Sequence, residues 1–221
     1  IMAGGTLVFV MGPRPSSTFG ISMGSVPPSM TKYNNEGVHT LSVGNNTFSV
    51  SSSEGGRILS YTYNGREILS PASVHQLNYG STLWPSPQRD WGWPPYPVLD
   101  TESYVVRMDQ DTLVLDSKPD TVSGFRFQKK FSIDMRDSSV RIAYSIFNIS
   151  REEKKVAAWD VCRTKGGVSF FPIDKNTDLP ASSLKGVFVN DDILWYHFNK
   201  DSVPEPQKLF STAKEGWLAH L

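Results

Sequence analysis

The sequence predicts an all-β fold, a large sandwich or barrel, from three observations. From Val38 onwards the chain is a series of short runs that alternate apolar and polar residues at hairpin spacing. Turn residues join several of these runs, most clearly Asn64 and Gly65, both of which accept the positive φ that a two-residue hairpin needs. No long run shows the i, i+3, i+4, i+7 apolar spacing of a helix.

The expected strands follow one another along the chain. Turns are predicted at residues 44–46, 64–65, 110–111 and 135–137, each between two alternating runs. In the strand after the last of these turns, alternate apolar residues share one face: Val140, Ile142, Tyr144 and Ile146. The expected strands are residues 39–44, 46–52, 56–63, 66–70, 103–109, 112–117, 124–134, 138–150, 154–164, 166–173, 186–190, 192–198, 208–210 and 216–221.

Size, charge and cysteine content narrow the function classes. The chain has 221 residues, enough to bury a core without disulfide or metal support. Lys plus Arg and Asp plus Glu are both 22, so the formal charge is zero and we expect no nucleic-acid partner. The single cysteine, Cys162, allows no intrachain disulfide, and the four histidines are too scattered for metal-ligand spacing. We therefore predict no metal and no cofactor.

We expect residues 1–37 to be a flexible leader and residues 38–221 to be one domain. The apolar run from Gly4 to Gly12 is too short to span a bilayer, so no stable membrane insertion is expected. The run is either the remnant of a secretory signal peptide or a disordered segment. The first alternative predicts a periplasmic or secreted protein. The last expected strand ends with the chain, and we expect the fold either to stop there or to be truncated there.

A loop rich in tryptophan and proline stands out at residues 80–97, "GSTLWPSPQRDWGWPPYP". It holds three tryptophans and five prolines, shows no regular period, and is predicted to be stiff. A stiff aromatic surface suits a sugar ring, whose C–H face is apolar and whose hydroxyls need polar partners. We expect Trp84 and Trp93 to stack on the sugar, and Gln88 and Arg89 to bind its hydroxyls. Alternatively, the loop is a plug that buries its indoles as core.

Three stretches resemble galactose-mutarotase-like domains of the aldose 1-epimerase superfamily. They are "EGGRILSYTYNGREIL" (54–69), "YGSTLWPSPQRDWGWPP" (79–95) and "AAWDVCRTKGGVSFFP" (157–172). The nearest resemblance is to an uncharacterised bacterial branch with a Trp/Pro-rich pocket loop. The resemblance covers residues 38–221 and implies a β-supersandwich with a carbohydrate-facing concave side.

The family's chemistry implies further site residues. Mutarotases open and close a sugar ring with a carboxylate base and a histidine acid. This chain has Trp and Pro residues where the family has its first pocket histidine, and Trp159-Asp160 where it has the second. The family's glutamate would fall beyond Leu221. The candidate acid–base residues are therefore His75, upstream of the loop, and Asp160.

Three more residues are candidate ligand contacts. Arg57 follows Gly55-Gly56 at the start of a strand and could place its guanidinium on sugar hydroxyls or a carboxylate. Strand alternation puts Trp159 and Arg163 on one face and Asp160 on the other.

Three functions stay open at this point. The first is a carbohydrate-binding mutarotase-like domain, which as an enzyme would be an aldose 1-epimerase-like isomerase. The second is a non-catalytic carbohydrate-recognition module. The third is a structural sandwich whose loop is only a plug.

Overall fold

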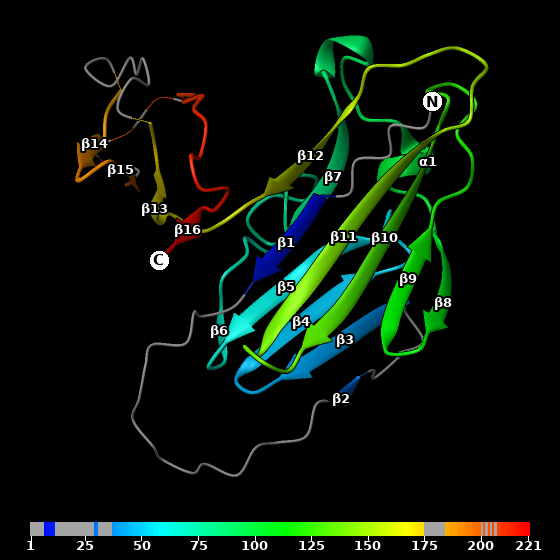
Figure 1. Ribbon diagram of the computed structural model, residues 1–221, viewed down its shortest axis with the longest axis horizontal. Coiled ribbons are helices and arrows are strands. Elements are labelled where there is room, and N and C mark those ends of the chain that lie inside the picture. The colour runs from blue at the N-terminus through cyan, green and yellow to red at the C-terminus, as the bar shows by residue number, and fades with distance from the viewer. Residues whose placement is uncertain are drawn as a thin grey trace. The chain divides into compact units, whose positions relative to one another are not determined.

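The predicted all-β class is confirmed by a computed structural model (Figure 1). The structure describes residues 7–11, 29–30, 37–174, 184–199, 201, 203, 205 and 207–221. Within that part of the chain, the only helical segments are the short turns η1 (Gln88–Asp90) and α1 (Pro97–Asp100). The chain divides into two compact units, Ile1–Arg163 and Thr164–Leu221, where we expected one domain.

The first sheet of unit 1 is antiparallel throughout. Its strands lie in the order β1-β11-β10-β9-β8. Their bounds are Leu7–Met11 (β1), Val105–Asp109 (β8), Thr112–Asp116 (β9), Phe125–Asp134 (β10) and Ser139–Asn148 (β11). The two long strands, β10 and β11, form the hairpin predicted at residues 135–137.

The second sheet of unit 1 has the order β12-β7-β5-β4-β3-β2, with β6 beside β5. Its strands are Ser29–Met30 (β2), Val38–Val43 (β3), Asn46–Ser51 (β4), Arg57–Tyr63 (β5), Arg66–Glu67 (β6), Ser81–Ser86 (β7) and Ala157–Cys162 (β12). Strands β1 and β2 both fall inside the segment expected to be a flexible leader. The apolar run from Gly4 to Gly12, one interpretation of which is a signal-peptide remnant, contains β1, and that interpretation stays a prediction. The remainder of residues 1–36 lies outside the described residues.

Turn chemistry explains the hairpins. Asn64 and Gly65, between β5 and β6, have φ values of 51° and 74°, as the Asn-Gly signal predicts. Gln110, between β8 and β9, also has a positive φ of 51°. These turns are local, so the sequence alone located them.

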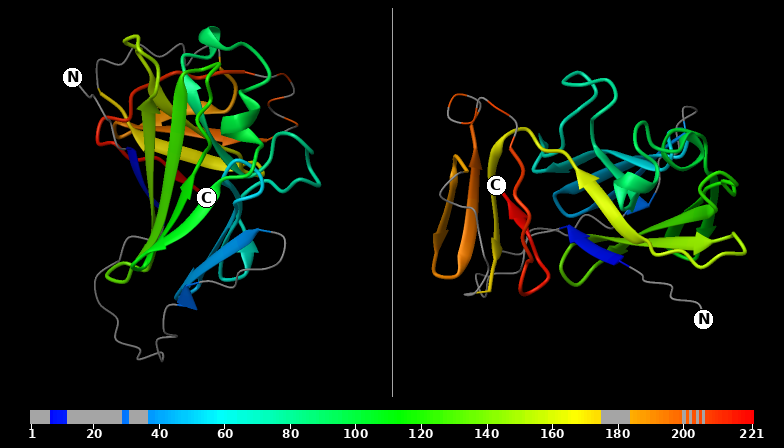
Figure 2. Two further views of the ribbon diagram at one scale, coloured as in Figure 1. Left: turned by 90° about the vertical axis from the view of Figure 1, so that its right-hand side faces the viewer. Right: turned by 90° about the horizontal axis from the view of Figure 1, so that it is seen from above.

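The core of unit 1 lies between its two sheets. Figure 2 shows the two layers from two further sides, with β3–β5 in blue to cyan and β8–β11 in green to yellow-green. The rings of Phe48 in β4 and Phe131 in β10 meet across the layers, 5.6 Å between centroids. Further fully buried members from the two sheets include Leu41, Val50, Ile58, Leu83, Leu113, Leu115, Phe127, Val140 and Ile142. Unit 1 is thus a β-sandwich.

Unit 2 is a small antiparallel sheet in the order β14-β15-β13-β16. Its strands are Gly167–Pro172 (β13), Val187–Asn190 (β14), Ile193–Phe198 (β15) and Ala219–His220 (β16). Phe171, Ile173 and Leu194 form its core on one face. Aromatic rings stack across the neighbouring strands on the other face, from Phe170 to Trp195 to Phe188. The strand expected at residues 208–210 does not form.

Candidate functional site: an indole cluster at the edge of the sandwich

The Trp/Pro-rich segment begins with a regular strand, which the sequence reading missed. Residues 81–86 form β7, which pairs along its whole length with β12. In this register Trp84 lies directly opposite Trp159. After β7 the chain passes through η1 and then α1, where Pro97 occupies the first helical position and so costs no hydrogen bond.

Trp84 is the centre of the site rather than an open platform. Its side chain is only 7% exposed. Its indole N–H donates a hydrogen bond to the Asp100 carboxylate at 2.8 Å. The same carboxylate lies 3.6 Å from the guanidinium of Arg57, so a buried ion pair holds the acceptor of the indole. Trp84 therefore has little surface left on which a sugar could stack.

Three further indoles pack edge-to-face against Trp84. Their ring centroids lie 5.8 Å (Trp91), 5.7 Å (Trp93) and 5.4 Å (Trp159) from that of Trp84. These separations and near-perpendicular planes are the favoured geometry of aromatic pairs. Trp93 is 56% exposed and Trp159 is 37% exposed. We call these four residues the indole cluster; it has a buried centre and two exposed members.

The two candidate arginines take different positions around this cluster. Arg57 is buried; its guanidinium donates to the carbonyls of Leu77 and Tyr79 and lies 4.4 Å from the centre of the Tyr79 ring. It holds the loop before β7 and has no exposed face for a ligand. Arg163 is half-buried, donates to the Thr82 hydroxyl, and lies 5.2 Å from the centre of the Trp84 ring. It therefore shares a face with Trp159, as alternation predicted.

Gln88 and Arg89 lie on the exposed turn η1. The Gln88 side-chain amide donates a hydrogen bond to the carbonyl of Gly92, which closes the turn just before Trp93. Arg89 forms an exposed ion pair with its neighbour Asp90 at 3.7 Å. Neither side chain contacts the indole cluster through a hydrogen bond among the described residues, so their role as sugar partners stays a prediction.

His75 and Asp160 have different partners. The His75 ring is exposed, and its Nδ1 accepts the backbone N–H groups of Leu77 and Asn78. Asp160 accepts a hydrogen bond from the Ser81 hydroxyl at 2.6 Å, and burial raises the pKa of its carboxyl. Each of the two side chains is hydrogen-bonded to neighbouring groups of the protein, and no hydrogen bond joins His75 to Asp160.

A buried lysine lies behind this sheet, and the sequence reading did not single it out. Lys129 in β10 is 2% exposed, and its ammonium donates to the carbonyls of Gly55 (2.7 Å) and Gly56 (3.2 Å). Burial lowers its pKa to about 8. Position 55 requires glycine here, because a Cβ there would clash with the carbonyl oxygen of Asp100, at 2.0 Å. The lysine thus fixes the turn that enters β5.

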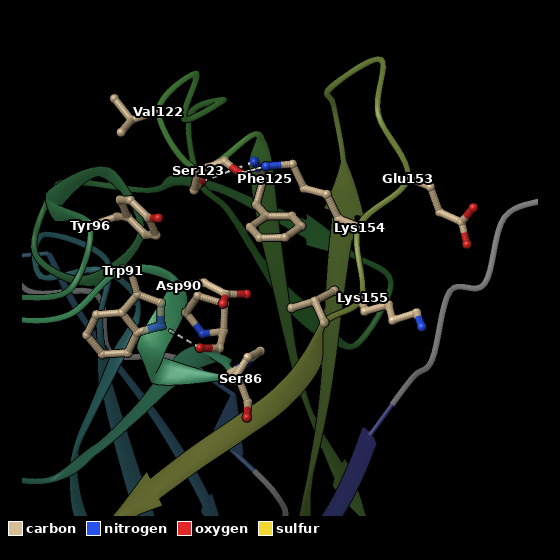
Figure 3. A pocket seen from close by; sticks show the side chains of 13 residues that line it. Ser86, Asp90, Trp91, Tyr96, Val122, Ser123, Phe125, Glu153, Lys154 and Lys155 are labelled. Carbon is tan, nitrogen blue, oxygen red and sulfur yellow. Dashed lines mark hydrogen bonds between the residues drawn. The ribbon is translucent and has the colours of Figure 1, made fainter.

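A pocket of about 390 Å³ adjoins the other side of the loop (Figure 3). Three segments of the chain line it, through residues 85–87, 90–91, 96, 122–123, 125 and 153–156. Trp91 and Tyr96 form one wall and Phe125 the other, while Glu153 and Lys155 point away from these rings. The indole N–H of Trp91 donates to the Pro85 carbonyl at 2.7 Å, which fixes that wall.

Three findings concern the chain beyond this site. Among the described residues, no three His, Cys, Asp or Glu side chains gather where they could hold a metal ion. No helix in the described part of the chain is long and apolar enough to cross a membrane. No protein-family model matches the chain. The resemblance to mutarotase-like domains therefore stays an expectation.

Proposed function

We propose that unit 1 binds a carbohydrate through the exposed indoles of Trp93 and Trp159. The observation that carries the proposal is the packing of both rings against the buried Trp84. A sugar ring presents a flat C–H face that packs on an aromatic ring, and a platform whose rotamers are already fixed loses little entropy when it binds. Single exposed apolar side chains are common on protein surfaces, whereas exposed aromatic side chains that gather in one place are typical of a binding surface.

Polar groups beside the platform fit the same ligand. Arg163 lies on the Trp159 face of β12, and its guanidinium already donates to the Val161 carbonyl and the Thr82 hydroxyl. Guanidinium groups held in this way have N–H donors in a fixed geometry, which suits vicinal hydroxyls. A sugar on the indoles would thus find both an apolar and a polar partner.

We further infer that the fold is the galactose-mutarotase-like supersandwich. The support is that the stretches with the family resemblance contribute β5, β7 and β12, which are neighbours in one sheet. The third stretch also continues into β13, which belongs to the sheet of unit 2. We favour binding over ring-opening catalysis, because His75 and Asp160 are each occupied by other partners. Acid–base roles for these two residues remain predictions.

The test is carbohydrate binding by single tryptophan variants. A glycan array run with the unaltered protein identifies a ligand, and calorimetry then gives its affinity for Trp93→Ala and Trp159→Ala. We expect each variant to bind about tenfold more weakly, since truncating an aromatic anchor commonly removes more than about 1 kcal/mol.

Trp217→Ala is the matched control, because Trp217 is a partly exposed tryptophan in unit 2. It should leave the affinity unchanged. Equal affinity in all four proteins, or no binding to any glycan, would contradict the proposal.

A further inference from the structure

The pocket beside Trp91 contains a positioned cation. The ammonium of Lys154 donates to the carbonyl of Ser123 at 2.7 Å and lies 5.3 Å from the centre of the Phe125 ring (Figure 3). A cation over an aromatic face is attracted by the ring quadrupole. Lys154 is therefore held at the pocket wall rather than free in solvent.

The turn under Lys154 is rigid. Asp120 is buried and accepts the backbone N–H of Ser123 through its carboxylate and that of Gly124 through its carbonyl. Gly124 has a φ of 74°, and a Cβ there would lie 3.0 Å from Cε of Lys154. A glycine thus both permits the turn and leaves room for the lysine stem to lie against it.

The ammonium of Lys154 has N–H donors available for a ligand. Within the described part of the chain, Lys154 forms no ion pair. Glu153 lines the pocket but points away from its aromatic rings, and Asp90, another lining residue, is paired with Arg89. An ammonium carries three N–H donors, and only one of those of Lys154 has a partner within the described residues. The pocket therefore offers an unneutralised positive charge beside aromatic walls.

Size and wall chemistry limit the ligand. A volume of about 390 Å³ falls within the range of small-molecule sites. The facing rings, with Trp91 and Tyr96 on one side and Phe125 on the other, suit a flat ring with apolar faces. The free N–H groups of Lys154 suit an anion or a hydroxyl at the edge of that ring.

We propose that this pocket binds an anionic pyranose, with its ring between the aromatic walls and its acidic group on the ammonium of Lys154. The proposal rests on the carbohydrate binding proposed above and names a ligand class for a second surface of the same loop. Carboxylate and sulfate groups share the required chemistry, and the experiment separates them.

The experiment compares three probes by calorimetry: glucose, glucuronate and glucose 6-sulfate. The unaltered protein should bind at least one of the anionic sugars about tenfold more tightly than glucose, and the better probe tells carboxylate from sulfate. In Lys154→Met that preference should disappear, because a charge-assisted hydrogen bond is lost. Lys118→Met is the control, since Lys118 forms an exposed ion pair with Glu102 away from the pocket lining, and it should retain the preference.

Two further measurements keep the outcome clear. Raising the salt concentration should weaken binding of the anionic sugar to the unaltered protein and leave glucose binding unchanged. Lys154→Arg, which keeps the charge, should retain part of the preference if Lys154→Met proves poorly folded by circular dichroism.

Equal affinities for glucose and both anionic sugars, or an undiminished preference in folded Lys154→Met, would overturn the anionic-ligand proposal alone. If glycans bind and depend on Trp93 and Trp159 while no anionic sugar is preferred, the proposed function survives without it. Absence of binding to any sugar would remove the proposed function itself.

Discussion

Replacing Lys129 with methionine should remove a rise in stability between pH 8 and pH 10.5. Lys129 is buried between the two sheets with two backbone carbonyls as hydrogen-bond partners. Its pKa falls from 10.5 to about 8, first because burial disfavours the charged form, with nearby Asp100 and Asp160 acting in the opposite direction. Methionine fills a similar volume and cannot titrate.

The sign follows from counting bound protons. Between pH 8 and 10.5 the unfolded chain keeps the Lys129 proton and the folded chain has lost it. The unfolded state then binds more protons, so the free energy of unfolding rises with pH. The contribution is complete above pH 10.5 and is lost as the pH falls through about 8. With 1.36 kcal/mol for each pKa unit, the full rise is about 3 kcal/mol.

Urea unfolding at a series of pH values measures this directly. The quantity to plot is the unfolding free energy of the unaltered protein minus that of Lys129→Met, because the buried Tyr104 and Tyr144, whose pKa values burial raises, titrate in both proteins. Lys130→Met is the control, since Lys130 alternates to the outward side of the same strand. A difference that stays flat or falls between pH 8 and 10.5 would refute the burial argument.

Three further predictions concern stability. Gly55→Ala should cost about 2–4 kcal/mol in urea unfolding, because its Cβ meets the Asp100 carbonyl at 2.0 Å, whereas Gly65→Ala, with open space around it, should cost only about 1 kcal/mol of backbone strain. Trp84→Phe should lower the unfolding free energy by about 1–3 kcal/mol, since the buried Asp100 carboxylate loses a donor; an unchanged urea midpoint would argue against that bond. Burial lowers the pKa of His39, so the unfolded chain takes up its proton at a higher pH than the folded chain; stability should fall as the pH drops below about 6.5, and less so in His39→Gln, as urea midpoints would show.

The hairpins were predictable because each depends on neighbouring residues, whereas β7 was not. Proline argues against a strand interior, since it cannot donate to a ladder. Strand β7 contains Pro85 but meets β5 only at Ser81, so residues 82–86 have a strand partner on one side alone. Pro85 therefore breaks no ladder hydrogen bond towards β5. Its partner β12 is distant in the sequence, and no local pattern predicts that the two strands pair.

The site was predictable in part. Trp93 and Trp159 carry exposed indole surface, and alternation placed Arg163 on the Trp159 face. Burial of Trp84 and Arg57 could not be foreseen, because both depend on Asp100, which α1 brings back beneath them. Lys129 could have been found, since Phe127 and Phe131 flank it at alternate positions on the core face. The pocket could not, because three separate segments build it.

Four of the six tryptophans in the chain share the indole cluster. Transition dipoles at centroid separations below 6 Å couple strongly, so light absorbed by one ring is shared with its neighbours. The emission of unit 1 will therefore report the cluster as a whole, and replacing one member will alter the signal of the others. An exciton band in circular dichroism should therefore disappear when Trp84 loses contact with the other three indoles. That band would report on the loop separately from the unfolding of the sheets.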